Sequence, residues 1–281
     1  MDLLIRPALS GKTAVVTGGS GVLCRVFCRA LAACGAKVAV LNRTLEKGEA
    51  VAAAIRAEGG EAMAVAADVT DMESLKRAHE EIVGAFGPCR ILINGAGGNR
   101  GEANTEREFF IPADGAAEGG FFDLDEKAFS SVVDLNLLST FRATQVFSRD
   151  MAGGGGGVVV NISSINAFTP LTKIPAYSAA KAGVSNFTQW LAVHFAKAGI
   201  RVNALVPGFF STEQNRTLLW REDGTPTVRA EKIIAGTPMG RMGKPEELIG
   251  ALLWLIDDKS AGFVTGAVIP VDGGFSAYSG V

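Results

Sequence analysis

The sequence predicts an α/β protein with a parallel sheet of seven strands and helices on both faces. Two observations support this. Short apolar runs rich in Val and Ile alternate with helical segments, and the first run leads directly into a glycine-rich turn. A chain of 281 residues that is 48% hydrophobic can bury one large core. We therefore expect a single domain over residues 1–281.

The predicted elements follow one another in a regular order. Apolar runs predict the strands, at residues 13–17, 37–41, 62–66, 91–94, 158–162, 201–205 and 268–271. Helical patterns lie between them, at residues 21–34, 45–58, 70–86, 125–151, 177–197 and 245–256. Thr70 and Glu73 have the spacing of a capping box at the third helix. The glycines at 153–157 predict a tight helix-to-strand loop, because a strand follows at once.

Composition and charge argue against several classes of function. A formal charge of −2 does not suit a surface for nucleic acid. Four cysteines without paired spacing and only two histidines indicate neither a metal site nor a disulfide framework, so reduced thiols are expected. No run of eighteen apolar residues and no secretory signal is visible, so we expect a cytoplasmic protein that does not enter the membrane.

A glycine-rich turn follows the first predicted strand. Gly19-x-Gly21-x-x-Cys24 has the pattern of a dinucleotide fingerprint in which the last glycine is replaced. Glycines allow positive φ and let backbone amides approach a pyrophosphate at a helix N-terminus. Between a first strand and a first helix, this turn predicts dinucleotide binding in a Rossmann-type, doubly wound fold.

Asn42 and Arg43 follow the second predicted strand, where an acidic residue would bind the ribose 2′-hydroxyls. A carboxylate there would repel a 2′-phosphate, whereas an arginine pairs with one. The sequence therefore favours NADP(H) over NAD(H). In the alternative interpretation, Arg43 is a solvated charge or stacks on the adenine without reading the phosphate.

Tyr177 and Lys181 lie four residues apart at the expected start of a helix, which places the phenol and the ammonium on one helical face. The positive charge favours the phenolate, so the pKa of Tyr177 is expected to fall below its usual value of about 10. A tyrosine of lowered pKa is suited to acid/base catalysis near neutral pH. On spacing alone, the alternative is an exposed pair without a chemical role.

Several short motifs then occur in a characteristic order. Thr17-Gly18 is followed by Asp68-Val69, Asn94-Gly95-Ala96-Gly97, Asn136, Ser164, Tyr177, Lys181, Pro207-Gly208 and Asp272-Gly273-Gly274. Over residues 11–274 this order resembles the short-chain dehydrogenase/reductase family. The resemblance implies a Rossmann-type fold and hydride transfer between NAD(P) and a CH–OH or C=O group. Val22 and Cys24 stand where the family has glycines, which questions the phosphate geometry but not the fold.

The resemblance also implies a role for each matching residue. Tyr177 would be the acid/base, Ser164 the hydroxyl that orients the substrate carbonyl, and Lys181 the group that lowers the pKa of Tyr177 and holds the nicotinamide ribose. Asn136 would hold a water that links Lys181 to solvent. Tyr177 and Lys181 also count among the residues implied in cofactor binding, the others being Gly18, Gly19, Ser20, Gly21, Val22, Leu23, Asn42, Arg43, Asp68, Val69, Asn94, Ala96, Gly97, Pro207, Gly208 and Thr212.

Four of these assignments have a local alternative. Ser163 is the active serine if the register differs by one. For Asn136, the alternative is a purely structural role in a helix kink. For Asp68, it is a role only in marking the start of the third helix. For Thr212, it is a solvated loop hydroxyl.

Two segments, 99–122 and 209–236, are expected to border the substrate pocket. They offer donors suited to a carboxylate and several hydroxyls: Asn99, Arg100, Arg107, Asn215, Arg216 and Arg221. Asn99, Arg100, Asn215 and Arg216 are the candidate substrate contacts. Phenylalanines in the same segments are compatible with the alternative of an apolar substrate, such as a steroid or an acyl chain.

The long segment at 99–122 and the C-terminal run resemble the D-mannonate oxidoreductase (fructuronate reductase) branch of the family. This implies a sugar-acid substrate and reversible reduction of D-fructuronate to D-mannonate. A gluconate 5-dehydrogenase type and a 3-oxoacyl carrier-protein reductase are the enzymatic alternatives. A non-catalytic dinucleotide sensor is the alternative of a different class. The family resemblance also suggests a homotetramer built through the helices at 125–151 and 177–197.

Overall fold

The computed structural model describes residues 6–111, 119–212 and 216–280. Its centre is a seven-stranded parallel sheet of order β3-β2-β1-β4-β5-β6-β7. The strands are β1 Thr13–Thr17, β2 Lys37–Asn42, β3 Glu61–Ala66, β4 Cys89–Asn94, β5 Gly157–Ile162, β6 Ile200–Pro207 and β7 Val268–Val271. The strand order reverses at β1 and β4, which is where open α/β sheets form a ligand crevice beyond the strand ends.

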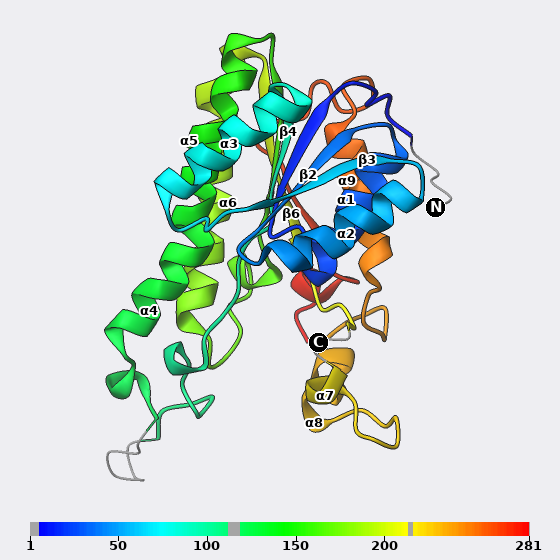
Figure 1. Ribbon diagram of the computed structural model, residues 1–281. Coiled ribbons are helices and arrows are strands. Elements are labelled where there is room, and N and C mark those ends of the chain that lie inside the picture. The colour runs from blue at the N-terminus through cyan, green and yellow to red at the C-terminus, as the bar shows by residue number, and fades with distance from the viewer. Residues whose placement is uncertain (1–5, 112–118, 213–215, 281) are drawn as a thin grey trace.

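Helices cover both faces of this sheet (Figure 1). The α-helices of the described residues are α1 Val22–Ala33, α2 Leu45–Ala57, α3 Met72–Phe86, α4 Glu126–Val133, α5 Ser139–Gly153, α6 Pro175–Phe195, α7 Arg216–Leu219, α8 Val228–Ala235 and α9 Ile249–Ile256. Successive strand residues point to opposite faces. Ala14 and Val16 pack with α1, α2 and α9, whereas Val15 packs with α3, α5 and α6. The predicted doubly wound, Rossmann-type architecture is confirmed.

The start of α3 differs from the prediction. Asp71, not Thr70, is the N-cap, and its side chain accepts a hydrogen bond from the backbone N–H of Glu73. The hydroxyl and the N–H of Thr70 both donate to Asp68 Oδ1, at 2.6 and 2.9 Å. Because this local turn occupies the Thr70 hydroxyl, the predicted capping box is wrong.

The helix expected at residues 125–151 contains one irregular turn. Between α4 and α5 the chain forms a π-helical turn, Asp134–Leu138. Asn136 lies in this turn, and its side-chain amide donates to the carbonyl oxygen of Val132 at 2.8 Å. Such π turns occur frequently at functional sites.

Two segments project beyond the end of the sheet at which the strands end (Figure 1). The first follows β4 and packs through the buried Ala103 against Val132 of α4 and Ala176 of α6. The second follows β6 and contains α7 and α8. A small apolar core is formed by Leu219, Ala230 and Ile233 of this segment together with Met242.

None of the helices in the described ranges combines the length and the apolar character needed for a membrane span. All four cysteines are free thiols, and Cys24, Cys28 and Cys89 are buried.

Gly156, in the tight loop between α5 and β5, offers a test of this packing. Gly155 and Gly156 both have positive φ, +93° and +95°, so alanine at either position costs about 1–2 kcal/mol of backbone strain. A Cβ at Gly156 would also collide with the backbone oxygen of Gly199, whereas a Cβ at Gly155 has open space. We predict that urea denaturation shows a clearly larger stability loss for Gly156→Ala than for Gly155→Ala. Equal losses would contradict this packing.

Candidate active site

A cavity of about 400 Å³ lies beyond the carboxyl ends of the central strands. It brings together segments that are far apart in the sequence: the turn after β1, the end of β4, the residues after β5 and the start of α6. Its lining includes Gly21, Val22, Leu23, Gly97, Ser164, Tyr177, Lys181, Pro207, Gly208 and Thr212. Residues that the sequence assigned separately to cofactor binding and to catalysis therefore share one cavity.

Lys181 is a buried cation at the base of this cavity. Its side chain rises from α6, and Nζ donates a hydrogen bond to the carbonyl oxygen of Ile162, at the end of β5, at 2.8 Å. The residue is only 5% exposed. Burial lowers the pKa of Lys181 to about 8, because the charged form loses its hydration.

Tyr177 lies in the first turn of α6, which begins at Pro175. Burial raises the pKa of its phenol above the ordinary value of 10, and a hydrogen bond with the Ser164 side chain opposes that shift. The expected fall in this pKa is therefore wrong for the protein alone. Lys181 Nζ lies over the phenol ring, 5.6 Å from its centre, and the loss of hydration determines the direction.

The structure distinguishes the two adjacent serines. The Ser163 hydroxyl donates to the backbone oxygen of Lys181 at 3.0 Å and lies 2.7 Å from the Ser185 hydroxyl. These contacts tie β5 to α6. Ser164, in contrast, interacts with Tyr177. This geometry does not support the alternative in which Ser163 is the active serine.

Asn136 meets Lys181 beside Gly97. The Asn136 amide donates to the Gly98 carbonyl oxygen at 2.7 Å, and its Oδ1 accepts from the Gly98 N–H at 3.2 Å. A Cβ at residue 97 would lie 2.6 Å from Asn136 Oδ1 and 3.3 Å from Lys181 Nζ. A side chain at residue 97 would therefore collide with Asn136 and crowd Lys181, and glycine leaves the room that both need.

The glycine turn after β1 is shaped for close backbone approach. Gly18 has φ +63°, and a Cβ there would meet the Ala96 backbone at 2.9 Å. Gly21 caps α1 without a side-chain hydrogen bond, so backbone N–H groups of the first helical turn remain available to an anion. Cys24 occupies a family glycine position, and its sulfur lies against Gly95, which has no side chain to obstruct it.

The side chains at the end of β2 divide into two roles. Asn42 Oδ1 accepts a hydrogen bond from the Ser20 N–H at 2.8 Å, and its amide group contacts the Ser20 hydroxyl, so Asn42 braces the glycine turn. Arg43 is exposed. Hydrogen bonds from Thr70 lower the pKa of Asp68, and the nearby charge of Arg43 adds to this shift. Arg43 and Asp68 thus lie close together, and the buried Val69 follows Asp68 in the chain.

Thr17 and Asn94 join the ends of β1 and β4. The Thr17 hydroxyl accepts hydrogen bonds from the N–H groups of Gly95 and Ala96, each at 3.1 Å. The Asn94 amide donates to Thr144 and Asn161 at 2.9 and 2.8 Å. The sequence signal for this role of Thr17 was its place at the end of a strand, directly before the turn.

Of the four predicted substrate contacts, the two that the structure describes, Asn99 and Arg100, do not line the cavity. Asn99 is exposed and its amide donates to Asn104 at 2.9 Å, and Arg100 is exposed as well. Asn215 lies outside the described residues. Arg216 begins α7, and its side chain lies outside the described part of the structure. Phe209 and Phe210, two of the phenylalanines that left an apolar substrate as an alternative, line the cavity.

Comparison with known proteins now decides the family. The model of the short chain dehydrogenase family matches residues 12–222. The chain belongs to this family.

Relatives of this dehydrogenase match it over almost their whole length. It is 57% identical over 274 residues to UxuB, an uncharacterized oxidoreductase of Bacillus subtilis, with 97% of this chain and 98% of the relative covered. A crystal structure of a candidate D-mannonate oxidoreductase from Haemophilus influenza, with bound NAD, is 51% identical at a TM-score of 0.93 and covers 98% of both chains. A gluconate 5-dehydrogenase from Burkholderia cenocepacia, in complex with NADP and tartrate, is 29% identical at a TM-score of 0.81, with 98% of this chain and 99% of that one covered.

The dehydrogenase is an NAD(P)-dependent oxidoreductase, and its residues fit a dinucleotide. Gly18 and Gly21 leave room for a pyrophosphate at the N-terminus of α1, and the cavity continues from this turn to Tyr177. In the described ranges, no three His, Cys, Asp or Glu side chains are grouped to hold a metal ion.

The buried ammonium of Lys181 predicts a pH-dependent cost in stability. The pKa is about 8 in the folded protein and 10.5 as its ordinary value. Between these values the unfolded chain binds more protons, so this group makes stability rise with pH across that window. Below pH 8 the full cost is present.

We predict that Lys181→Met raises the free energy of unfolding at pH 7 by about 2 kcal/mol, after allowance for the lost hydrogen bond to Ile162. The difference from wild type should shrink as pH rises from 8 towards 10.5. Urea denaturation across this pH range measures it. A variant less stable than wild type at pH 7, or a difference that does not change with pH, would contradict the cost of the buried charge.

Proposed function

We propose that this dehydrogenase reduces the keto group of a sugar acid, D-fructuronate, to give D-mannonate, and catalyses the reverse oxidation. The observation that carries the proposal is the single cavity that joins the glycine turn to Ser164, Tyr177 and Lys181. The substrate is supported by the 51% identity to the candidate D-mannonate oxidoreductase, which covers 98% of both chains.

The proposed chemistry needs one hydride and one proton. The nicotinamide cofactor supplies the hydride when bound. Tyr177 donates its phenolic proton to the carbonyl oxygen as negative charge develops there, and the Ser164 hydroxyl donates a hydrogen bond to the same oxygen. The keto group thereby becomes a CH–OH group, and Tyr177 is left as a phenolate. Lys181 stabilises this phenolate and binds the nicotinamide ribose.

We propose that Asn136 positions the route by which protons return to Lys181. Its side chain lies beside Lys181 at Gly97, and the π turn of the helix fixes it there. The proposed cofactor contacts follow the cavity and the adjoining strand ends: Gly18–Leu23 at the pyrophosphate, Asp68 and Val69 at the adenine, Asn94–Gly97 at the ribose, and Pro207, Gly208 and Thr212 at the nicotinamide.

We further propose that the enzyme assembles as a homotetramer through α5 and α6. Helix α6 carries an aromatic row in which the half-buried Phe187 stacks on the exposed Trp190 and Trp190 stacks on the exposed His194, with ring centres 6.2 and 4.7 Å apart. Val193, beside this row, is 81% exposed. Apolar side chains gathered on one face favour burial against another subunit.

Gluconate 5-dehydrogenase activity is the second candidate, because a protein of that function shares the fold at a TM-score of 0.81. It would use the same proton donors, so only the substrate distinguishes the two proposals. Acyl thioesters, the substrates of a 3-oxoacyl carrier-protein reductase, are the more distant option.

Steady-state assays with D-fructuronate, 5-keto-D-gluconate and acetoacetyl thioester test the proposal. We predict the highest kcat/KM for D-fructuronate. Tyr177→Phe should lose at least about 1000-fold in kcat, because the phenol is the proton donor. It should still bind the cofactor, since the cavity keeps its shape. Highest activity on the thioester would overturn the sugar-acid assignment, and full activity in Tyr177→Phe would overturn the catalytic assignment.

The exposed Arg43 at the end of β2 supports a preference for NADP(H). Its guanidinium can pair with a 2′-phosphate that NAD lacks. We predict that Arg43→Ala lowers the ratio of kcat/KM for NADP to that for NAD by about 10-fold or more, as expected for loss of a charged hydrogen bond. An unchanged ratio would remove Arg43 from cofactor selection. Exposed Lys47 on α2, changed to Ala, is the matched control.

A further inference from the structure

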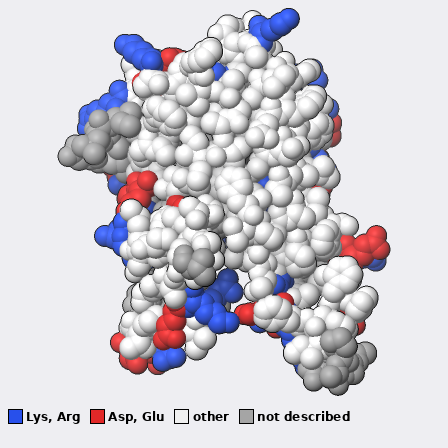
Figure 2. Space-filling model, turned by 180° about the vertical axis from the view of Figure 1, so that it is seen from behind, with Lys and Arg blue, Asp and Glu red and all other residues white. Residues whose placement is uncertain are grey.

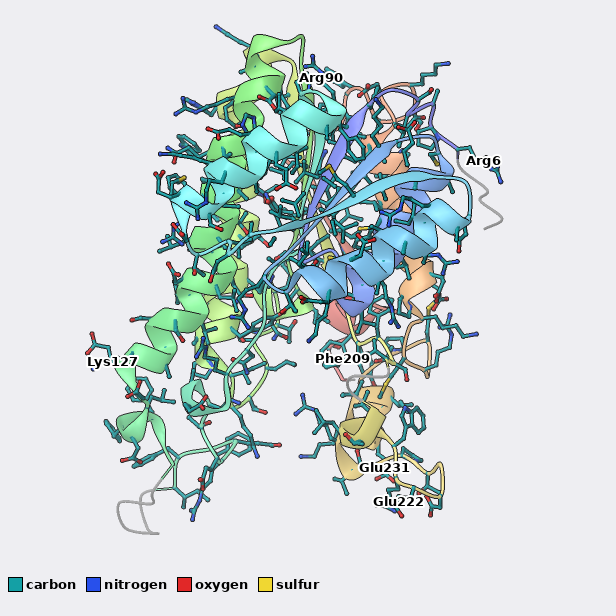
Figure 3. The ribbon with its side chains drawn as sticks, in the orientation of Figure 1. Arg6, Arg90, Lys127, Phe209, Glu222 and Glu231 are labelled. Carbon is teal, nitrogen blue, oxygen red and sulfur yellow. The ribbon has the colours of Figure 1, made fainter. Side chains whose placement is uncertain are left out.

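A second cavity of about 440 Å³ adjoins the catalytic one. Phe209 lines both, and it lies where the sheet meets the projection that carries α7 and α8 (Figure 3). The rest of the second cavity comes from four segments that are distant in the sequence. Its lining is Glu108, Leu171, Thr172, Lys173, Phe209, Val228, Arg229, Lys232, Ile233 and Phe275.

This second cavity is rich in positive charge. Three of its lining residues are cations, Lys173, Arg229 and Lys232, against one carboxylate, Glu108. Figure 2 shows Lys and Arg side chains gathered at the notch between the two lower projections. The Glu108 carboxylate pairs with Lys232 at 3.1 Å and so compensates that lysine.

Lys173 and Arg229 are left without a compensating charge. Among the described residues, neither side chain forms a hydrogen bond or an ion pair. Both are exposed to solvent at the cavity. Two uncompensated cations beside an apolar wall favour an anionic ligand, and a guanidinium matches the planar geometry of a carboxylate.

The backbone conformation of Lys173 fixes its position relative to the catalytic residues. Lys173 has φ +73°, and no other non-glycine residue of the described chain has positive φ. Its carbonyl oxygen accepts a hydrogen bond from the Thr105 N–H at 2.9 Å, which joins it to the segment after β4. Strain of this kind persists where the surrounding structure enforces it and is common at ligand sites. Four residues later the chain reaches Tyr177.

We propose that the second cavity binds the carboxylate of the substrate, with Lys173 and Arg229 as its anchors. This inference rests on the proposed sugar-acid function. In such a substrate the keto carbon and the carboxylate are several bonds apart. With the keto group at Tyr177 in the cavity that would also hold the cofactor, we place the carboxylate in the adjoining cavity. Phe209 forms the shared wall along which the chain between them passes.

The experiment compares Lys173→Met and Arg229→Met with wild type. Methionine keeps the length of the aliphatic stem and removes the charge. Lys127→Met is the matched control, because Lys127 is an exposed lysine of α4 outside this cavity (Figure 3). Three quantities are measured: KM and kcat for D-fructuronate, and, by isothermal titration calorimetry, the Kd of D-mannonate for the enzyme with reduced cofactor, which cannot oxidise it.

We expect each cavity variant to raise both KM and Kd about 10- to 100-fold, as for loss of a charged hydrogen bond, with kcat within about threefold of wild type. Arg229→Lys should recover part of the loss. Lys127→Met should behave as wild type.

The outcomes separate this inference from the proposed function. If the Lys173 and Arg229 variants bind D-mannonate as tightly as wild type, the proposed carboxylate anchor is wrong. This holds even if the wild-type enzyme reduces D-fructuronate. Highest wild-type activity on another substrate class overturns the proposed function, while the Kd of D-mannonate in the variants still decides the anchor. A wild-type complex that binds no D-mannonate overturns the anchor as well.

Discussion

The hydrogen bond from Lys181 Nζ to the Ile162 carbonyl oxygen holds a positive charge in a place that water hardly reaches. The surrounding residues are constrained by it. Gly97 leaves room for the approach of Asn136 to Lys181, and Ser163 fixes the Lys181 backbone to β5. The buried charge opposes folding, and its pKa of about 8 expresses that cost. Proteins retain such a destabilising group where it has a functional role, and the role proposed for the Lys181 ammonium is to stabilise the Tyr177 phenolate.

The sheet brings this charge to the cofactor turn. Parallel strands end at one edge, and the reversal at β1 and β4 opens a crevice there. Thr17 at the end of β1 binds the backbone after β4, so the glycine turn and Gly97 are held in one unit. The two projecting segments then add a second cavity whose charges have no counterpart in the turn itself. Under our two proposals, hydride transfer and the choice of substrate thus occupy different parts of the molecule.

Apolar periodicity predicted the fold, and helical spacing predicted that Tyr177 and Lys181 share one face, because both are local properties. The family resemblance, not spacing, implied that Ser164 joins them. The sequence-based predictions were wrong where contacts between residues distant in the chain determine the local structure. Thr70 binds Asp68 instead of capping α3, and α7 and α8 form around a small core of their own. The Asn99 amide donates a hydrogen bond to Asn104, and Lys173 and Arg229 line one cavity only because the tertiary fold brings their segments together. The direction of the Tyr177 pKa depends on burial, which helical spacing does not reveal.

The central claim is that the Tyr177 phenol becomes an effective acid only through its setting beside Lys181 and the cofactor. The chain has two tyrosines, so in a Tyr278→Phe variant ultraviolet difference spectroscopy reports Tyr177 alone. The account predicts phenolate formation above the ordinary pKa in the free protein and a shift to lower pH when NAD⁺ is added, because its nicotinamide cation favours the anion. A titration that NAD⁺ leaves unchanged would contradict it.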